Sequence, residues 1–342
     1  MPKVSQKNKF IKKGLYYILT EWKHDYHELK HLIYLSKLDG FTGKSRVHIG
    51  DVFQRAMITN VLSDLQSNSN IELSEIIYDE INYLISKRLK TRSGGWSYYP
   101  SCPEISADAD DLGEIMQVFI RNKNKTLVES YCEKSLNILL QERIDKNNGI
   151  ETWIVPKGNL TKKERQQIYF NTTKWGPGPD NEVMANFLYG LALYDKEKYK
   201  DQILKSCDYL LNQQDKEGYW RSRWYYGNYY GTYKCLRLFK EMNIQDSKIS
   251  RAKIYVQKSQ NENGGWGIGN LSDSLNSAFA ILCLNSLNEE IPPIAFKYLH
   301  QLQQPNGSWD AVPFIKPRSN ESYRSSTLTT AIVLKSLVNS NL

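Results

Sequence analysis

The sequence has no closely paired cysteines, no long apolar run and only a modest excess of one charge, and each absence excludes a class of protein. Its five cysteines are far apart and form no CxxC pair, so we expect reduced thiols in the core. No stretch approaches the roughly 20 apolar residues that span a bilayer. The first residues, MPKVSQKNKFIKKG, lack the apolar core of a leader peptide. We therefore expect a cytoplasmic globular protein, with peripheral membrane contact left open.

Charge is distributed along the chain rather than gathered in blocks. The 45 Lys and Arg residues exceed the 37 Asp and Glu residues by 8, but the two signs are interleaved, which argues against a nucleic-acid-binding surface. Only the first 13 residues hold a basic run, with five lysines. We interpret residues 1–20 as a basic tail or first helix. Weak attraction of this run to an anionic membrane or a diphosphate stays open.

A short pattern, Gln-x-x-x-Gly-x-Trp, occurs three times in the second half of the chain. The copies are QDKEGYW (214–220), QNENGGW (260–266) and QQPNGSW (303–309), and their Trp residues are 46 and 43 positions apart. A degenerate copy ends at Trp96, and a weaker one runs from Gln141 to Trp153. A period of this length is typical of stacked helical hairpins, which bury their apolar faces only against one another.

The segments around each copy indicate helices. An apolar-periodic segment precedes each copy, and a second apolar run that starts with small or hydroxylated residues follows it, as at Thr232, Ser277 and Thr327. Sustained two-residue alternation is absent, so little strand is expected. The Tyr-rich run 224–230 is interpreted as a loop leading into a helix. Five or six hairpins of about 50 residues would make an all-α, closed or nearly closed domain over residues 21–342.

The most unusual charged string is Asp108-Ala109-Asp110-Asp111, placed where the next apolar helix should begin. A bland interpretation is an N-cap with two further acids near the helix dipole. The alternative is chemical, because three carboxyl groups spaced this closely cannot all ionise where water is scarce. One would stay protonated and could protonate a weak base such as an alkene or epoxide. Nearby Trp and Tyr rings would stabilise the resulting cation.

The three Gln-x-x-x-Gly-x-Trp copies, the Asp-x-Asp-Asp string after Gly94-Gly95-Trp96, and the segment RWYYGNYYGT (223–232) together resemble class II terpene cyclases of the squalene-hopene cyclase type. The resemblance covers roughly residues 85–340. It implies an (α/α)6 barrel and the cyclisation of a linear isoprenoid, started by proton transfer from an aspartic acid. It implies no required cofactor, with magnesium accompanying the phosphates only if the substrate carries a diphosphate.

The resemblance also implies roles for individual residues. Asp110, the middle aspartate, would be the general acid, supported by Asp108 and Asp111. Substrate-lining positions implied by the resemblance are Tyr99, Trp175, Asn186, Trp224 and Tyr230. Basic residues that could contact a diphosphate are Lys174, Arg221, Arg223 and Arg324.

Two departures from the family pattern change what is expected. The triterpene cyclases carry two helical barrels, whereas this chain has room for one, which favours a substrate with about fifteen or twenty carbons, or a partner that completes the site. The family often places a His beside the acid, in an Asp-x-x-Ala-His segment. The similar stretch here, 180–186, offers Asn186, which can hold the acid by a hydrogen bond but cannot relay its proton.

Three alternatives use the same residues differently. Protein prenyltransferase β subunits share the repeat, but their zinc-binding Asp-x-Cys segment corresponds to Asp273-Ser274-Leu275 here, without the Cys. Asp110-Asp111-Leu112-Gly113-Glu114 also matches the magnesium-binding DDxxE string of ionisation-type terpene synthases, although no second metal motif is evident. A non-catalytic helical repeat that binds a lipid or peptide is the third alternative. Oligomeric state does not follow from the sequence.

Overall fold

The computed structural model of the protein describes residues 2–36, 46–69, 71–316 and 322–339, with side chains from residue 7 onward. The chain divides into two compact units, described separately below. Unit 1 comprises Met1–Leu29, Asp64–Glu72 and Gln213–Leu342. Unit 2 comprises Lys30–Ser63 and Leu73–Asn212. The expected domain boundaries stay a prediction.

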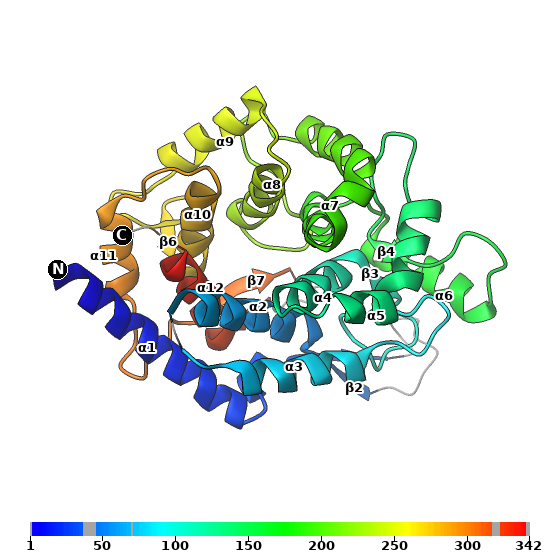
Figure 1. Ribbon diagram of the computed structural model, residues 1–342, viewed down its shortest axis with the longest axis horizontal. Helices are drawn as coiled ribbons and strands as arrows, with labels where there is room; N and C mark the ends of the chain where they lie inside the picture. The colour runs from blue at the N-terminus through cyan, green and yellow to red at the C-terminus, as the bar shows by residue number, and fades with distance from the viewer. Residues whose placement is uncertain (1, 37–45, 70, 317–321, 340–342) are drawn as a thin grey trace. The chain divides into compact units, whose positions relative to one another are not determined.

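Helices predominate in both units, as the repeat pattern predicts (Figure 1). The elements of unit 1 are α1 (Pro2–Lys23), η1 (His27–Leu29), α8 (Tyr229–Glu241), α9 (Ser247–Lys258), β5 (Trp266–Ile268), β6 (Leu271–Asp273), α10 (Ser274–Ser286), α11 (Pro293–Gln301), β7 (Val312–Ile315), β8 (Tyr323–Ser325) and α12 (Ser326–Val338). Those of unit 2 are β1 (His31–Leu35), β2 (Arg46–Gly50), α3 (Ser74–Lys87), β3 (Ala107–Asp108), α4 (Ala109–Arg121), α5 (Lys125–Asn137), η3 (Ile138–Glu142), β4 (Trp153–Ile154), α6 (Lys162–Phe170), η4 (Asn171–Trp175) and α7 (Asn181–Asn212). Helix α2 (Val52–Ser69) runs from unit 2 into unit 1.

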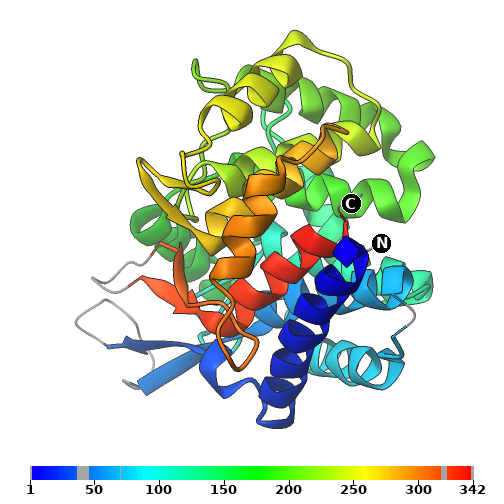
Figure 2. The same ribbon diagram turned by 90° about the vertical axis from the view of Figure 1, so that its left-hand side faces the viewer.

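Two kinds of helix alternate along the chain. Helices α4, α8, α10 and α12 are buried on every side over about three turns, whereas α3, α5, α9 and α11 bury only one face. Within unit 1, α10 packs between α8 and α12, and α12 packs against α1; Figure 2 shows α1 (blue) beside α12 (red). Within unit 2, α4 packs against α7 and α5. This alternation of fully buried and one-sided helices is that of stacked helical hairpins.

The Gln-x-x-x-Gly-x-Trp repeat is a joint between successive hairpins. In each full copy the Gln side-chain amide donates to the carbonyl of the Gly four residues later, at 2.8–2.9 Å, and the Trp is fully buried. The Trp backbone N–H donates to a hydroxyl on the following buried helix. These hydroxyls belong to Thr232, Ser277 and Thr330. For the third copy, the alignment of the repeats had predicted Thr327 instead of Thr330.

The Gly of each copy fits against the backbone of the next one-sided helix. A Cβ atom at Gly218 would lie 2.6 Å from the carbonyl oxygen of Arg251 in α9, and one at Gly264 would lie 2.7 Å from that of Ile294 in α11. At Gly307 the neighbouring carbonyl belongs to Lys13 in α1. The first helix of the chain therefore occupies the position of the next one-sided helix for the last copy.

Strand is scarce, as the sequence predicts. The described residues form four short two-stranded antiparallel sheets, of which β1–β2 is the longest, with five residues in each strand. The sequence reasoning did not locate β1 and β2, which are short segments of five residues each. The expected loop at 224–230 is confirmed up to Asn228, and α8 begins at Tyr229. All five cysteines are free and buried, as expected.

The joint glycines give a stability test with a matched control. Gly264 and Gly269 both have positive φ, +88° and +61°, but a side chain at Gly264 meets the backbone of α11 whereas one at Gly269 meets nothing within 4 Å. We expect Gly269→Ala to cost about 1 kcal/mol for the left-handed backbone. Gly264→Ala should cost about 2–4 kcal/mol, because a steric clash is added. Thermal and urea unfolding measure the loss of stability in each variant. Equal losses in both variants would show that the contact of Gly264 with the α11 backbone does not matter.

Candidate active site

The three aspartates lie where β3 ends and α4 begins. Asp108 is the N-cap of α4, and its Oδ1 accepts hydrogen bonds from the backbone N–H groups of Asp110 (3.0 Å) and Asp111 (2.8 Å). The bland interpretation is therefore correct for Asp108, which does cap the helix. It does not account for the burial of the other two, because Asp110 is 7% exposed and Asp111 only 1%. Carboxyl groups that served only the helix dipole would face solvent.

Asn186 on α7 holds the middle aspartate. Its Nδ2 donates to Oδ1 of Asp110 at 2.7 Å and to the backbone carbonyl of the same residue at 3.1 Å. The orientation of the amide is fixed in turn, because Nε2 of Gln117 donates to Oδ1 of Asn186 at 2.8 Å. Both amide residues are fully buried. This chain from Gln117 through Asn186 to Asp110 leaves the acid little freedom to rotate.

A close crossing of α4 and α7 brings Asn186 to Asp110. A Cβ atom at Gly113 would lie 2.7 Å from Cα of Phe187, and one at Gly190 would lie 2.8 Å from the carbonyl oxygen of Gly113. Glycines on both helices thus let the backbones approach directly, side by side in Figure 1. With larger residues at these two positions, the helices would separate and the Asn186 hydrogen bond would lengthen.

Burial dominates the electrostatics of the acidic string. Desolvation raises the pKa of Asp108 to about 6, although the backbone N–H groups at the helix start and that of Tyr98 act in the opposite direction. Desolvation also raises the pKa of Asp111 well above its usual value, with the charges of Asp108, Asp110 and Glu114 adding to the effect. Neither oxygen of Asp111 accepts a hydrogen bond from a donor group. A proton on Asp111 shared with Asp108 would satisfy both carboxyl groups, and burial favours this protonated form by raising the pKa of each.

Aromatic side chains gather beside the acidic string in unit 2. Tyr99 and Phe170 are buried in an apolar group with Leu35, Cys102 and Ile105, and the half-buried Trp153 and Trp175 pack against it. We call Tyr99, Phe170, Trp153 and Trp175 the aromatic cluster. The rings of Trp153 and Trp175 lie 6.1 Å apart, with an angle of 52° between their planes. Of the predicted lining residues, Tyr99, Trp175 and Asn186 thus belong to the same unit as the aspartates.

Trp153 is a site residue that the sequence reasoning did not identify. In the β3–β4 pair it lies directly opposite Asp108, and residues opposite each other in an antiparallel pair project from the same face. Its Nε1 donates to the carbonyl of Gly176 at 3.0 Å, which fixes the ring. The repeat alignment treats Trp153 as the end of a weak fifth copy, yet it is half-buried whereas Trp96, Trp220, Trp266 and Trp309 are completely buried. The signal in the sequence that could have identified Trp153 was its position at the end of a degenerate repeat copy.

Trp224 and Tyr230 belong to unit 1. Trp224 is half-buried in the loop before α8, with the Arg223 guanidinium 5.7 Å from its ring centre. Tyr230 is fully buried in α8, and its ring lies 4.2 Å from that of Tyr225 and 5.1 Å from those of Phe279 and Phe314. Their roles as lining residues stay predictions.

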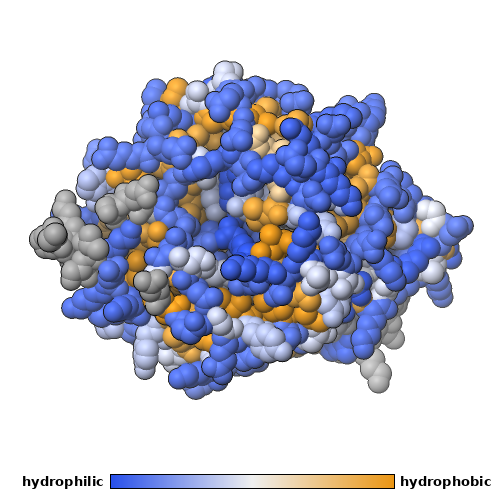
Figure 3. Space-filling model, viewed as in Figure 1, coloured by the Kyte–Doolittle hydropathy of each residue, from blue (hydrophilic) through white to orange (hydrophobic). Residues whose placement is uncertain are grey.

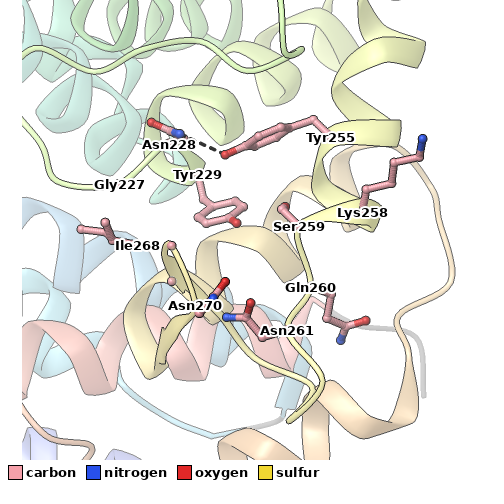
Figure 4. A pocket seen from close by; sticks show the side chains of 12 residues that line it. Gly227, Asn228, Tyr229, Tyr255, Lys258, Ser259, Gln260, Asn261, Ile268 and Asn270 are labelled. Carbon is pink, nitrogen blue, oxygen red and sulfur yellow. Dashed lines mark hydrogen bonds between the residues drawn. The ribbon is translucent and has the colours of Figure 1, made fainter.

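A pocket of about 410 Å³ in unit 1 is lined in part by Gly227, Asn228 and Tyr229 of the 223–232 segment, but by none of the predicted site residues. Figure 4 shows Tyr229 and Tyr255 on one side and the amide side chains of Asn261 and Asn270 on another. Asn228 donates to the Tyr255 hydroxyl at 3.0 Å. A lining of hydroxyl and amide groups does not suit a hydrocarbon, so we place the candidate active site at the aspartates instead.

The residues proposed for diphosphates or metals are dispersed. Arg221 is exposed and forms an ion pair with Asp215 at 3.3 Å, while Arg223 and Arg324 are exposed and Lys174 is half-buried. Asp273 caps α10 by accepting from the backbone N–H of Asn276 at 2.7 Å. In the part of the chain that the structure describes, no three His, Cys, Asp or Glu side chains are arranged to hold a metal ion.

Comparison with known proteins identifies the family. The Squalene-hopene cyclase C-terminal domain family matches residues 63–317, and the chain belongs to this family of class II terpene cyclases. A squalene–hopene cyclase of Bradyrhizobium diazoefficiens is 28% identical over 258 residues, which are 66% of this chain and 37% of that protein. One from Zymomonas mobilis is 29% identical over 249 residues, 65% of this chain and 37% of that protein. The chain thus spans well under half of these relatives.

Solved structures show the same fold. A variant of the type II terpene cyclase MstE from Scytonema, in complex with its substrate geranylgeranyl dihydroxybenzoate, aligns with a TM-score of 0.72 at 17% identity and covers 99% of this chain and 98% of that one. The ent-copalyl diphosphate synthase of Streptomyces platensis aligns with a TM-score of 0.59 at 16% identity, over 86% of this chain and 51% of that one. The predicted all-α fold of the (α/α)6 type is confirmed.

The described helices contain no segment with the length and apolar character needed to cross a bilayer. On the face drawn in Figure 3, hydrophilic residues predominate and apolar residues form smaller groups among them.

The raised pKa of Asp111 predicts a pH-dependent stability. Since the folded-state pKa exceeds the unfolded one, this site stabilises the fold fully below about pH 4 and loses that contribution as the pH rises. Asp111→Asn cannot ionise and keeps a donor toward Asp108, so its melting temperature should exceed that of the wild type by about 2–6 °C at pH 7–8. The gain should vanish near pH 4. Melting curves from pH 4 to 8 check this.

The exposed Asp201→Asn on α7 is the control and should follow the wild type at every pH. A loss of stability in Asp111→Asn that is equal at all pH values would mean that the native carboxyl is ionised and paired.

Proposed function

We propose that this chain catalyses the protonation-initiated cyclisation of a linear isoprenoid, with Asp110 as the general acid. The observation that carries the proposal is the burial of three carboxyl groups at the start of α4, one of them held by Asn186, beside an aromatic cluster. Family membership supports it. Burial among apolar groups raises the pKa of a carboxyl group, which keeps it protonated and available to donate to a hydrocarbon substrate.

Asp110 is the member of the string best suited to release a proton. Asp108 is occupied with capping α4, and Asp111 is turned toward Asp108. The Asn186 amide occupies Oδ1 of Asp110, so the transferable proton is expected on Oδ2. After transfer, the Asp110 carboxylate is stabilised by the same Asn186 N–H and by the N-terminus of α4.

The reaction is an isomerisation, of the intramolecular lyase type. The Asp110 proton adds to the terminal double bond or epoxide, the resulting cation is attacked by the next double bond of the chain, and a final C–H proton is lost to a base. No atoms are gained or lost. Because Asn186 cannot relay a proton, we propose that the Asp108–Asp111 pair, whose pKa values are raised by burial, restores the proton of Asp110.

The proposed substrate is a prenyl chain of fifteen or twenty carbons, as a diphosphate or a prenylated compound. The substrate of MstE, which this chain matches over nearly its whole length, is geranylgeranyl dihydroxybenzoate, an aromatic acid with a twenty-carbon prenyl chain. No cofactor takes part in proton transfer, and magnesium would enter only with a diphosphate group. We further propose a cytoplasmic location with peripheral contact to the membrane in which such substrates dissolve, and no nucleic-acid partner.

Replacing the acid separates this proposal from its alternatives. Purified protein should convert farnesyl diphosphate, geranylgeranyl diphosphate, squalene or a prenylated aromatic acid into a cyclic isomer of unchanged mass, detected by chromatography and mass spectrometry. Asp110→Asn should lower turnover by at least about 10³-fold, while its affinity for the same compound stays within about threefold. Asn186→Ala should lower turnover about 10–100-fold, because the acid loses its positioning bond.

Three results would overturn the proposal. Asp110→Asn with full activity would exclude the acid. Tight binding without any cyclic product from the whole panel would favour the non-catalytic lipid- or peptide-binding repeat. Release of diphosphate that requires magnesium would instead favour the ionisation-type synthase.

Trp153 provides a test of cation stabilisation. Both Trp153→Phe and Trp153→Leu lose the bond to Gly176, but only the Phe variant keeps a π face beside the acid. A cation over an aromatic ring gains up to about 2 kcal/mol when desolvated, so the Leu variant should be about 10–30-fold slower than the Phe variant. Single-turnover rates of cyclic product measure the ratio. Equal rates would show that the ring serves packing only.

A further inference from the structure

The pocket of unit 1 has a buried floor and an exposed rim. The floor includes Tyr229, the first residue of α8, which is 3% exposed, and the half-buried Tyr255 near the end of α9. The rim carries Lys258, Ile268 and Asn270, whose side chains are exposed. The volume of about 410 Å³ falls within the range of about 300–1,000 Å³ that is usual for small-molecule sites. The pocket is therefore open to solvent and large enough for a small ligand.

A hydrogen bond between two helices fixes the aromatic side of the pocket. Asn228 is the N-cap residue of α8, yet its side chain does not cap the helix. Its Nδ2 donates instead to the Tyr255 hydroxyl at 3.0 Å, which ties the start of α8 to α9 (Figure 4). The ring centres of Tyr229 and Tyr255 lie 6.0 Å apart. This side of the pocket thus presents two phenol rings in a set arrangement.

A tight turn fixes the opposite side. Strands β5 and β6 are joined by the two-residue turn Gly269-Asn270, which is a connection of the shortest common type. A Cβ atom at Gly267 would overlap the carbonyl oxygen of Leu271, so the two strands meet without an intervening side chain. Nδ2 of Asn261, just after α9, donates to Oγ of Ser272 in β6 at 2.8 Å. The amide groups on this side are therefore carried by a well-defined backbone.

These amide groups keep hydrogen-bonding capacity that the protein does not use. Among the residues that the structure describes, none donates to Oδ1 of Asn228 or Asn261, and the Asn270 side chain forms no hydrogen bond. An amide side chain offers two N–H donors and one carbonyl acceptor. Each can therefore bind a ligand group that both donates and accepts, and a hydroxyl group is the simplest of these.

The charges of the lining residues argue against an ionic ligand. None of the 12 lining residues is Asp or Glu, so a metal cation would lack its preferred carboxylate ligands. The one cationic lining residue is Lys258, on the exposed rim, and no Arg is present to bind a phosphate or carboxylate bidentately. A hydrocarbon would leave the amide groups without partners. The lining suits a neutral molecule with several hydroxyl groups, whose C–H face packs on the tyrosine rings.

We propose that this pocket, between the start of α8, the end of α9 and the β5–β6 turn, binds a small neutral polyhydroxylated molecule, a monosaccharide or a cyclitol. Asn261 and Asn270 hydrogen-bond its hydroxyl groups from one side, and Tyr229 and Tyr255 cover its apolar face from another (Figure 4). The site shares no residue with the candidate active site. The proposal therefore goes beyond the proposed cyclisation and does not depend on it.

Saturation-transfer difference NMR on the full chain tests the proposal, with D-glucose, D-galactose, D-mannose and myo-inositol as separate probes. At least one probe should bind with a millimolar or tighter Kd, as expected for a ligand of about 12 non-hydrogen atoms. Binding of the sugars or of inositol identifies which of the two the site takes. Asn270→Ala should weaken binding about three- to tenfold, because it removes hydrogen bonds to hydroxyl groups. The control Gln301→Ala, an exposed amide of α11 outside the pocket, should bind like the wild type.

A change of charge at the rim distinguishes a neutral ligand from an anion. Lys258→Gln should keep the Kd within about twofold of the wild-type value, and an excess of inorganic phosphate should not displace the bound probe. A loss of about tenfold or more in Lys258→Gln, or displacement by phosphate, would overturn the proposal in favour of an anion site.

A dye at the rim gives a second measurement that does not depend on Asn270. Because the five native cysteines are buried, Ile268→Cys on the rim can be labelled selectively, as can the control Ile254→Cys, exposed on α9 but outside the lining. Emission of the dye at 268 should change as the probe binds, with the same Kd, and that at 254 should stay constant. No binding of any of the four probes, equal affinities of Asn270→Ala and Gln301→Ala, or equal dye responses would overturn the proposal.

Discussion

Removing three carboxyl groups from water is the constraint on which the site depends. The free-energy cost of this burial opposes folding, and it is met by the N-terminal N–H groups of α4 for Asp108 and by the amide of Asn186 for Asp110. The Asp111 carboxyl group accepts no hydrogen bond from a donor, so keeping its proton is what lowers the cost of burying it. The same burial that opposes folding therefore raises the pKa of Asp111 and favours its protonated form.

The geometry of the site follows from backbone contacts rather than from the acids themselves. Asn186 reaches Asp110 because α4 and α7 touch at Gly113 and Gly190, where neither helix has a side chain. Buried tryptophans of the repeat hold the hairpins at fixed spacing, each through its backbone N–H or its indole N–H. Trp153 and Trp175 differ from the repeat tryptophans because they are only half-buried, so part of each ring is not covered by packing in a joint.

Local patterns predicted the elements that local physics determines. The Gln-x-x-x-Gly-x-Trp copies and the Asp string located the joints and the start of α4, because capping and turn formation depend on neighbouring residues. Sequence could not pair β3 with β4, so it missed Trp153 opposite Asp108. It also missed β1 and β2, since Leu32 and Ile33 are equally apolar although they lie on opposite faces. Which apolar face is covered is a tertiary property.

The joint at Gly307 has a consequence for biosynthesis. Gln303 donates to the carbonyl of Phe10, 293 residues earlier, at 3.1 Å, and α12 packs along α1. Domains form as their parts become available during translation. Helix α1 therefore waits without this neighbour while the residues between them are synthesised. A chaperone acting on the nascent chain would find an unpaired helix there.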